Sequence, residues 1–551
     1  MSTRSSGGSV NLLAGPHHDG SALYVSNLAP ALGEVVRVRL RVPHDHAPSA
    51  VHVRLVVDGE QKFVEARVEH ADEIETWWIA DLTCHNPVTG YRFLLDGGRA
   101  GYAWLNGAGL HRRDVPDASD FRLVAHSDPP PRWARDAVVY QIFPDRFARS
   151  AAADSRAAPG WALPAPWDEP VDGRMGPASR QLYGGDLDGV GERLDYLVDL
   201  GVTVIYLTPF FPAHSNHRYD ATTFAAVDPL LGGDEALRRL TDAAHARGIR
   251  VMGDFTTNHT GSAHEWFLAA RADPRAPERD FYFWEGQEYV AWLGVKSLPK
   301  LNYDSVTLRE RLFDDPQGVV RKWLGPDGGL DGWRVDVANM TGRYGAQDHN
   351  HEVAALMRDA MVSHAPGSLL VGEHVHDFSV DVPGTGWHGV MNYAGFTKPV
   401  WTWLSDPVTA PDFLGSPVIV PRLGGVETVE TIRDFTSRVS WQAVTHSFNL
   451  VGSHDTTRIR TLVGADPRLV DVAAGLLLTM PGIPMITYGD EIGMAGEWGE
   501  DGRRPMPWEP QDWDARLREV YRSLIGLRRS SAALRHGGLR WVYADHDAIV
   551  Y

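Results

Sequence analysis

The chain has 551 residues and a formal net charge of -18. Nucleic acids are bound through basic surfaces, so this acidic balance argues against a protein that follows a phosphate backbone. No stretch is long and apolar enough to span a membrane, and the first residues lack the apolar core of a signal peptide. The only cysteine, Cys84, cannot form an intramolecular disulfide, which is typical of reducing compartments. We therefore expect a cytoplasmic protein whose partners include neither nucleic acid nor a membrane.

Residues 1–128 have the pattern of an N-terminal β-sandwich. Four runs alternate apolar and polar residues and are separated by turn residues: 34–42, 49–59, 76–82 and 90–98. Such alternation predicts strands that bury one face, as in a small antiparallel sandwich. The proline-rich stretch 127–133 follows and predicts a linker.

Residues 129–528 have a different pattern, in which short apolar runs alternate with amphipathic helical stretches. The predicted strands are 137–143, 202–210, 249–255, 332–338, 369–374, 389–393, 448–454 and 483–489. The helical stretches are 192–201, 234–248, 348–365, 428–443, 467–480 and 513–529. Eight strands alternating with helices favour a closed (β/α)8 barrel. A doubly wound open sheet is the alternative, but no glycine-rich dinucleotide turn follows the first strand.

Two segments lie outside this alternation. Residues 258–308 form a long insertion after the third strand, and long loops in compact domains are usually functional, so we expect it to overhang the barrel. Residues 529–551 look like the first strands of a C-terminal β domain that is either very short or truncated. The predicted fold class is therefore multidomain α/β, a (β/α)8 barrel with a β-sandwich before it and a β unit after it.

Charged and polar residues gather at the predicted strand ends, where barrels of this type carry their active sites. In chain order they are Asp254, Asn258, His259, Arg334, Asp336, Glu373, His454 and Asp455. Arg334 and Asp336 are two residues apart, so both point to one face of the fourth strand. Any one of these residues alone is more often a cap, a turn former or a satisfied polar group. Carboxylates repel one another, however, so a cluster at successive strand ends favours a functional site.

A metal centre is the alternative interpretation of this cluster, since histidines and carboxylates could hold zinc or manganese. No two histidines stand four residues apart beside an acid, and Arg334 would oppose a cation. We therefore predict neither a metal nor a cofactor.

Four segments resemble the signature regions of the α-amylase superfamily, glycoside hydrolase family 13. They are DFTTNH (254–259), GWRVDVAN (332–339), GEH (372–374) and VGSHD (451–455), in the order and spacing of that family. Two more, GVTVIYLTP (201–209) and GIPMITYGDE (482–491), resemble further regions of the family. SLPKLN (297–302) is similar to the fifth region in its neopullulanase form. The resemblance covers the barrel.

The resemblance implies a retaining α-glucosidic enzyme. By position, Asp336 matches the nucleophile, Glu373 the general acid/base and Asp455 the stabiliser of the transition state. Arg334 would keep the nucleophile ionised by lowering its pKa, and enclosure near other carboxylates would raise that of Glu373. The other matching residues are expected to organise the site or to bind the sugar: Tyr219, Asp254, Asn258, His259 and His454.

The N-terminal β domain and SLPKLN resemble neopullulanases, cyclomaltodextrinases, maltogenic amylases and maltodextrin glucosidases. This group implies an oligosaccharide substrate and, often, a homodimer formed through the N-terminal domain. Relatives that bind calcium carry an Asn- and Asp-rich loop after the first strand, but 147–155 is poor in both, so no calcium is predicted.

Some positions depart from the usual members of this group. His374 and Val375 follow Glu373 in place of Ile-Trp, which is closer to maltodextrin glucosidase. Asn339 and Met340 are expected to line the acceptor subsites, and His374 is expected to contact the substrate. RRPMPW (503–508) resembles a segment near the donor subsites, where Asp501 and Arg504 are expected to contact sugar.

The predicted function is hydrolysis of short maltooligosaccharides at α-1,4 bonds, with α-1,6 bonds and cyclic substrates left open. A transglycosylase on the same scaffold is the alternative, because hydrolysis and transfer differ only in the acceptor that attacks the glycosyl-enzyme. A non-catalytic sugar-binding relative is a third option, but such proteins lose the catalytic carboxylates that this chain keeps.

Overall fold

A closed barrel of eight parallel strands forms the centre of the computed structural model, which describes residues 10–11, 14–99, 101–126, 128–173, 176–406, 421–497 and 499–551. The strands are β11 (Val139–Ile142), β14 (Val204–Leu207), β15 (Arg250–Thr256), β18 (Gly332–Asp336), β21 (Leu369–His374), β22 (Gly389–Asn392), β23 (Phe448–Leu450) and β24 (Ile483–Thr487). They neighbour one another in chain order, and β24 closes on β11. The predicted barrel is confirmed, strand by strand.

Alternation along each barrel strand separates two environments. On β18, Trp333 and Val335 pack into the apolar layer between the strands and the helices, whereas Arg334 and Asp336 point inward. A separate apolar cluster, which includes Val139, fills the barrel interior below the polar residues. The polar strand ends therefore stand above a packed core, as is usual for this architecture.

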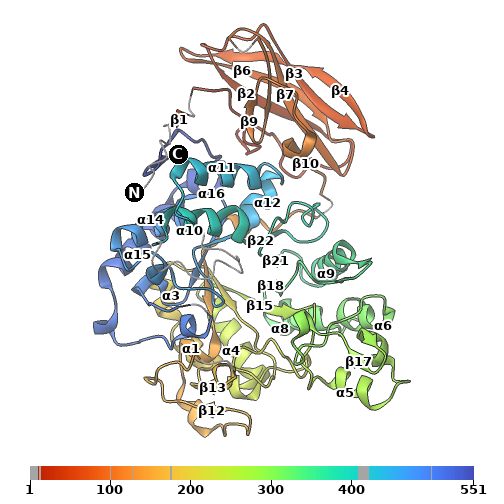
Figure 1. Cartoon of the computed structure of the whole chain (residues 1–551), viewed down its shortest axis with the longest axis vertical. Helices are drawn as coiled ribbons and strands as arrows, with labels where there is room; N and C mark the ends of the chain where they lie inside the picture. Colours follow the sequence, from red (N-terminus) through yellow and green to blue (C-terminus); the bar gives the residue numbers. More distant parts are fainter. Residues whose placement is uncertain are drawn as a thin grey trace.

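Helices surround the barrel (Figure 1). They are α1 (Pro144–Phe147), α2 (Leu187–Glu192), α3 (Leu194–Leu200), α4 (Gly233–His245), α5 (Glu265–Ala272), α6 (Val306–Arg309), α7 (Val319–Lys322), α8 (Gly325–Gly328), α9 (Asn350–His364), α10 (Lys398–Leu404), α11 (Gly425–Thr436), α12 (Trp441–His446), α13 (Ile459–Leu462), α14 (Pro467–Thr479) and α15 (Ala515–Ser530). The stretch 428–443, predicted as one helix, is divided between α11 and α12. The Ser440 hydroxyl starts the second helix by accepting a hydrogen bond from the Ala443 N–H.

The N-terminal region forms the predicted β-sandwich, which lies above the barrel in Figure 1. One sheet holds β2 (Val35–Pro43), β5 (Arg67–Ala71) and β6 (Glu75–Thr83). The other holds β3 (Ala50–Val57), β4 (Glu60–Glu65), β7 (Val88–Gly97), β8 (Gly101–Asn106), β9 (Gly109–His111) and β10 (Phe121–Val124). Arginines link the sandwich to α11 and the turn after it: Arg433 donates to the Ala108 carbonyl and Arg122 to that of Ser437.

The two ends of the chain meet in a small sheet, in which β25 (Tyr543–Ala544) pairs with both β1 (Val10–Asn11) and β26 (Ile549–Val550). Before it, α16 (Ala532–His536) follows α15. The domain limits 1–128, 129–528 and 529–551 stay predictions, and residues 1–9, 12, 13 and 127 lie outside the described part of the chain.

The insertion 258–308 contains α5, the hairpin of β16 (Trp284–Glu285) and β17 (Glu288–Tyr289), and the start of α6. Its return segment lies against the end of β15, where Leu301 N–H donates to the Asn258 carbonyl at 3.0 Å. Among the described residues, no helix has both the length and the apolar character needed to cross a membrane.

Candidate active site

Arg334 lies at the centre of a cluster of carboxylates at the ends of three adjacent strands. Register places Asp254 of β15 directly opposite Arg334 of β18. Its Nη1 donates to both oxygens of Asp254 at 2.9 Å and to Oδ1 of Asp336 at 3.0 Å. Its Nη2 lies 3.0 Å from Oε1 of Glu373, at the end of β21. One buried guanidinium therefore bridges three carboxylates that are remote in sequence.

The carboxylates differ in their access to solvent. Asp254 and Arg334 are fully buried, whereas the side chains of Asp336, Glu373 and Asp455 keep 10%, 13% and 39% of their surface exposed. The last three can therefore be reached by a ligand, while Asp254 lies behind them and holds Arg334 in place.

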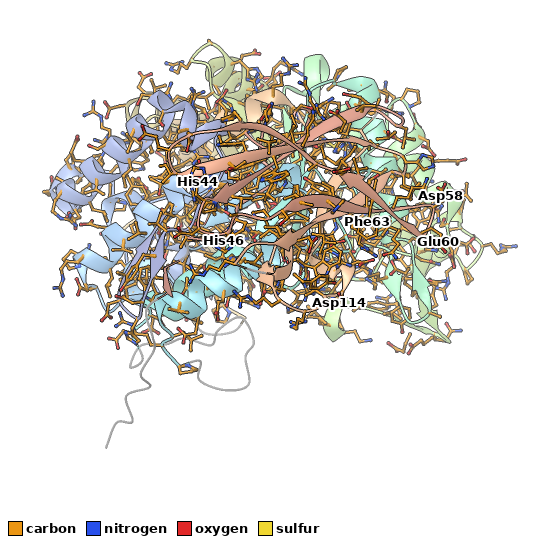
Figure 2. All side chains as sticks on the ribbon, turned by 90° about the horizontal axis from the view of Figure 1, so that it is seen from above. His44, His46, Asp58, Glu60, Phe63 and Asp114 are labelled. Atoms are coloured by element: carbon orange, nitrogen blue, oxygen red, sulfur yellow. The ribbon has the colours of Figure 1, made fainter. Side chains whose placement is uncertain are left out.

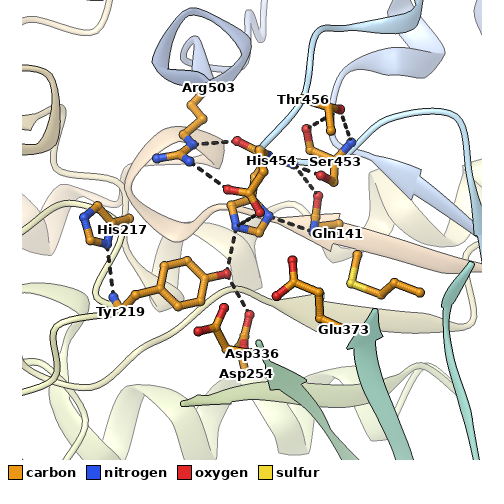
Figure 3. A network of polar contacts seen from close by, with 12 residues as sticks. Gln141, His217, Tyr219, Asp254, Asp336, Glu373, Ser453, His454, Thr456 and Arg503 are labelled. Atoms are coloured by element: carbon orange, nitrogen blue, oxygen red, sulfur yellow. Dashed lines mark hydrogen bonds and ion pairs between the residues drawn. The ribbon is translucent and has the colours of Figure 1, made fainter. Parts of the chain in front are cut away.

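A chain of hydrogen bonds runs from Asp254 to the end of β23 (Figure 3). The hydroxyls of Tyr206 and Tyr219 lie 2.6 and 2.9 Å from Asp254 Oδ2 and donate to it. The Tyr219 oxygen also lies 2.7 Å from Nε2 of His454, and the two rings stack. Tyr219 is therefore anchored at both sides, with its ring orientation determined by His454.

Gln141, at the end of β11, fixes the tautomer of His454. The backbone N–H of His454 donates to Gln141 Oε1 at 2.9 Å, so the amide nitrogen faces Nδ1 of the ring at 3.0 Å and donates to it. The ring proton then sits on Nε2 and points to the Tyr219 oxygen. Burial lowers the pKa of His454 to about 3, so the ring is neutral at pH 7.

Arg503 contacts the third carboxylate. Its Nη2 donates to Asp455 Oδ1 at 2.9 Å and its Nε to the His454 carbonyl at 2.6 Å. Burial raises the pKa of Asp455, but the guanidinium groups of Arg503 and Arg334 oppose this effect, and the net pKa lies below its usual value. The group is therefore a permanent anion near neutral pH.

Asp336 and Glu373 form an electrostatically coupled pair. Burial raises the pKa of both groups above their usual values. Arg334 lowers the pKa of both groups, as expected from the sequence, whereas burial and the neighbouring carboxylates act in the opposite direction. Since one negative charge disfavours the second, the pair holds a proton at a pH where isolated carboxyls do not.

Val337, directly after Asp336, has a φ of 46°, which is an outlier for a β-branched residue. This conformation lets its backbone N–H donate to Glu373 Oε2 at 2.8 Å. Strained residues cluster at active sites, where the surrounding structure holds them in place. The backbone that carries Asp336 thus also orients Glu373.

On the other side of Asp336, Nε2 of His259 lies 3.9 Å from Oδ2. Asn258 is fully buried, and its side-chain nitrogen lies 3.2 Å from Nδ1 of His259. Burial, with Lys300 adding to it, lowers the pKa of His259 to about 3. A second neutral imidazole therefore faces Asp336.

The remaining predicted contacts lie farther from this cluster. His374 is buried and bonds to Asp381 at 3.1 Å, so its side chain faces away from the open carboxyls. The backbone N–H of Asn339 donates to the backbone carbonyl of Glu373 at 3.4 Å. Asp501 and Arg504 bond to each other at 2.8 and 2.9 Å.

Sequence reasoning missed Gln141, Tyr206 and Arg503. Gln141 and Tyr206 are polar residues inside otherwise apolar predicted strands, which is a usable signal. Arg503 is the last residue of the short 3-10 helix Gly499–Arg503 and stands beside Arg504, so only the structure separates the arginine that reaches Asp455 from the one that does not. In the described ranges, no three His, Cys, Asp or Glu side chains are arranged to hold a metal ion.

Comparison with known proteins identifies the family. Residues 141–523 match the model for the alpha amylase catalytic domain. Neopullulanase 2 of Thermoactinomyces vulgaris is 33% identical over 94% of this chain and 85% of its own length. A cyclomaltodextrinase of Geobacillus thermopakistaniensis (strain MAS1) is 31% identical over 89% and 80%. A solved cyclomaltodextrinase structure aligns with a TM-score of 0.70 at 27% identity, over 98% of this chain and 88% of that one. The chain therefore belongs to the alpha-amylase family and is a glycoside hydrolase similar to its neopullulanase and cyclomaltodextrinase members.

Proposed function

We propose that the chain hydrolyses α-glucosidic bonds of short maltooligosaccharides with retention of anomeric configuration. The observation that carries this proposal is the bridge from Arg334 to Asp336 and Glu373, two carboxyls that solvent reaches and that share a raised affinity for one proton. A retaining glycosidase needs one ionised and one protonated carboxyl at the scissile bond. Neopullulanases and cyclomaltodextrinases among the relatives support the substrate class.

In this mechanism the shared proton resides on Glu373. Arg334 Nη1 donates a well-aligned hydrogen bond to Asp336, whereas Nη2 approaches Glu373 without hydrogen-bond geometry. The Asp336 carboxylate is thus the better stabilised anion. Glu373 gives its proton to the glycosidic oxygen as the C1–O bond breaks, and Asp336 forms a bond to C1 from the opposite face.

The second step reverses these roles. A water molecule gives its proton to the Glu373 carboxylate and attacks C1, and the bond to Asp336 breaks. The product leaves with its original configuration, and Glu373 is protonated again. Positive charge builds on the sugar ring in both transition states, and Asp455 is the permanent anion placed to stabilise it.

Neutral groups surround the sugar in this proposal. His259 and His454 both have a pKa of about 3, so at pH 7 they bind hydroxyls as neutral imidazoles and do not repel the developing cation. Tyr219 offers its ring face to the same sugar, at the place where hydrogen bonds to Asp254 and His454 hold it.

The test combines variants with product analysis. Asp336→Asn and Glu373→Gln should each lower kcat at least about a hundredfold on maltotriose, because each removes a group that makes or breaks a bond. NMR of the first product should show the α anomer. A β anomer, or a Glu373→Gln variant of normal activity, would refute the mechanism. Parallel assays with cyclodextrins, panose and isomaltose decide between linear, cyclic and α-1,6-linked substrates.

Transfer to a sugar acceptor is the second candidate activity, motivated by the departures at Val375 and Asn339, which are expected on the acceptor side. The relatives reported above carry the names of hydrolases, which does not favour it. A product map at high maltose concentration separates the two: longer oligosaccharides as major products would indicate a transferase.

A homodimer through the N-terminal sandwich is part of the proposal. Figure 2 looks onto this region and shows Phe63 on its outer surface, with Asp58 and Glu60 at the same end. Phe63 is half exposed and packs beside Trp104, so it offers apolar surface for a partner. Light scattering of the protein and of Phe63→Asp tests this: a monomer in both cases would refute it.

We also propose a cytoplasmic location. Cys84 is the only cysteine of the chain and is buried as a free thiol, so the fold needs no oxidising compartment. Cell fractionation with an antibody against the protein is the direct measurement, and recovery outside the cytoplasm would refute this.

A further inference from the structure

Lys300, in the SLPKLN segment of the insertion, buries its ammonium group beside the active site. Only 3% of the residue is exposed. Its Nζ donates to the side-chain oxygen of Asn258 and, at 3.1 Å, to the backbone carbonyl of Met340. Both acceptors are uncharged, and they come from two different loops above the barrel.

Among the residues that the structure describes, no carboxylate forms an ion pair with Nζ of this lysine, whose contacts are the two neutral oxygens. Burial lowers its pKa to about 8. Burying a cation without a counter-charge is unfavourable by several kcal/mol unless other interactions offset it, on the order of magnitude known for such groups. A neutral polar residue could donate to one carbonyl with a smaller desolvation penalty. Hydrogen bonding to a single acceptor therefore does not explain why a lysine is buried here.

The two acceptors lead directly to Asp336. Met340 ends the turn that follows the strand of Asp336, and its N–H donates to the Val337 carbonyl at 2.9 Å. Asn258 neighbours His259 and contacts its ring, and this ring faces Asp336 at 3.9 Å. Lys300 thus joins the backbone next to the nucleophile to the segment that carries the imidazole opposite it.

We propose that Lys300 is a positioning residue: its ammonium clamps the Asn258 side chain to the Met340 carbonyl and so sets the relative position of Asp336 and His259. It touches neither substrate nor reacting atoms. This inference rests on the proposed function, in which Asp336 attacks the sugar. It gives the insertion 258–308 a role in catalysis through one side chain.

The clamp predicts a defect in the chemical step. Lys300→Met keeps the length of the side chain and removes the ammonium. Its kcat on maltotriose should fall at least tenfold, while KM stays within about threefold, because Lys300 does not contact sugar. Lys296→Met is the matched control, since Lys296 lies in the same insertion with an exposed side chain and contacts Glu288 and the ring of Tyr289, both within the insertion. It should leave both constants unchanged.

A second substrate locates the defect. The fluoride of α-glucosyl fluoride leaves with little proton donation. A defect in the acid Glu373 therefore lowers kcat less on this substrate than on maltotriose, whereas a misplaced nucleophile lowers kcat equally on both. The fall in kcat for Lys300→Met should therefore be the same on both substrates. A fall on maltotriose alone would overturn the inference, because it would place the defect at the acid.

A double-variant cycle tests the path of the effect. Asn258→Ala removes one acceptor of the clamp, so the effects of Lys300→Met and Asn258→Ala on kcat should be far from additive. Additive effects would show that Lys300 acts elsewhere. If circular dichroism shows that Lys300→Met does not fold, Lys300→Gln replaces it in the same assays, with the same expected results. A folded variant with wild-type kcat overturns the inference. If Asp336→Asn is inactive in the same assay, the proposed function still stands, so the two failures can be distinguished.

Discussion

Replacing Arg334 by Met should produce a loss of stability that depends on pH. The variant keeps an apolar side chain in the barrel but removes the guanidinium that bridges Asp254, Asp336 and Glu373. Breaking a buried ion pair by removing one partner typically costs about 3–5 kcal/mol, because the remaining charge is buried without compensation. Arg334 serves three carboxylates, so we expect the upper end of this range at pH 8.

The sign of the pH effect follows from the carboxyls that are left. Without Arg334, burial and mutual repulsion raise the pKa of all three above their unfolded values of about 4. In the window between the unfolded and the folded pKa, the folded state binds more protons than the unfolded chain. The free energy of unfolding of the variant then falls as the pH rises through this window. The difference in stability between the wild type and the variant therefore grows with pH. Near pH 5 the deficit should be clearly smaller than at pH 8.

Urea unfolding followed by circular dichroism, at pH 5 and at pH 8, measures this difference. Arg516→Met is the control, because Arg516 forms an exposed pair with Asp471, and such a pair contributes little to stability at either pH. A deficit of Arg334→Met that is equal at both pH values would refute the reasoning, since it would show that lost packing and not uncompensated charge destabilises the variant.

Three further outcomes follow from the site and its surroundings. Arg503→Met should lower kcat/KM about 10–100-fold and raise the pKa of Asp455, which shifts the acidic limb of the pH profile upward, whereas Arg516→Met should not. At Val337, with φ of 46°, the Gly variant should be at least as stable as the Ala variant in urea unfolding, by up to about 1 kcal/mol, the reverse of the usual order. Burial lowers the pKa of His446 to about 4, so between pH 6.5 and 4 the unfolded chain binds the proton more tightly, and the His446→Phe variant should lose about 3 kcal/mol less stability than the wild type over this window in the same assay.

The barrel was predictable because its signal is local. Each strand is a short apolar run, and the order of runs and helices allows few closures. The same periodicity places Arg334 and Asp336 on the inner face of β18, as found. The sequence did not predict where one helix ends and the next begins. The amphipathic pattern over 428–443 continues across the break between α11 and α12, where the hydroxyl of Ser440 caps the second helix.

The candidate site was predictable in part. Strand ends converge in a barrel, so residues that follow successive strands were expected to meet, and Asp254, Asp336 and Glu373 do share one guanidinium. No such rule covers the segment after the last barrel strand, so the contact of Arg503 with Asp455 is not predictable from the sequence, and the expected sugar contact of Arg504 stays a prediction.

The strand order, the residues at each strand end and the family can be read from periodicity and motifs, which are properties of neighbouring residues. The bridge formed by Arg334, the positive φ of Val337 and the contacts of Lys300 appear only in the folded chain. Burial and the distances between residues remote in the chain arise only when the barrel closes and the insertion packs against it. These quantities control the charge of each group and therefore its chemistry.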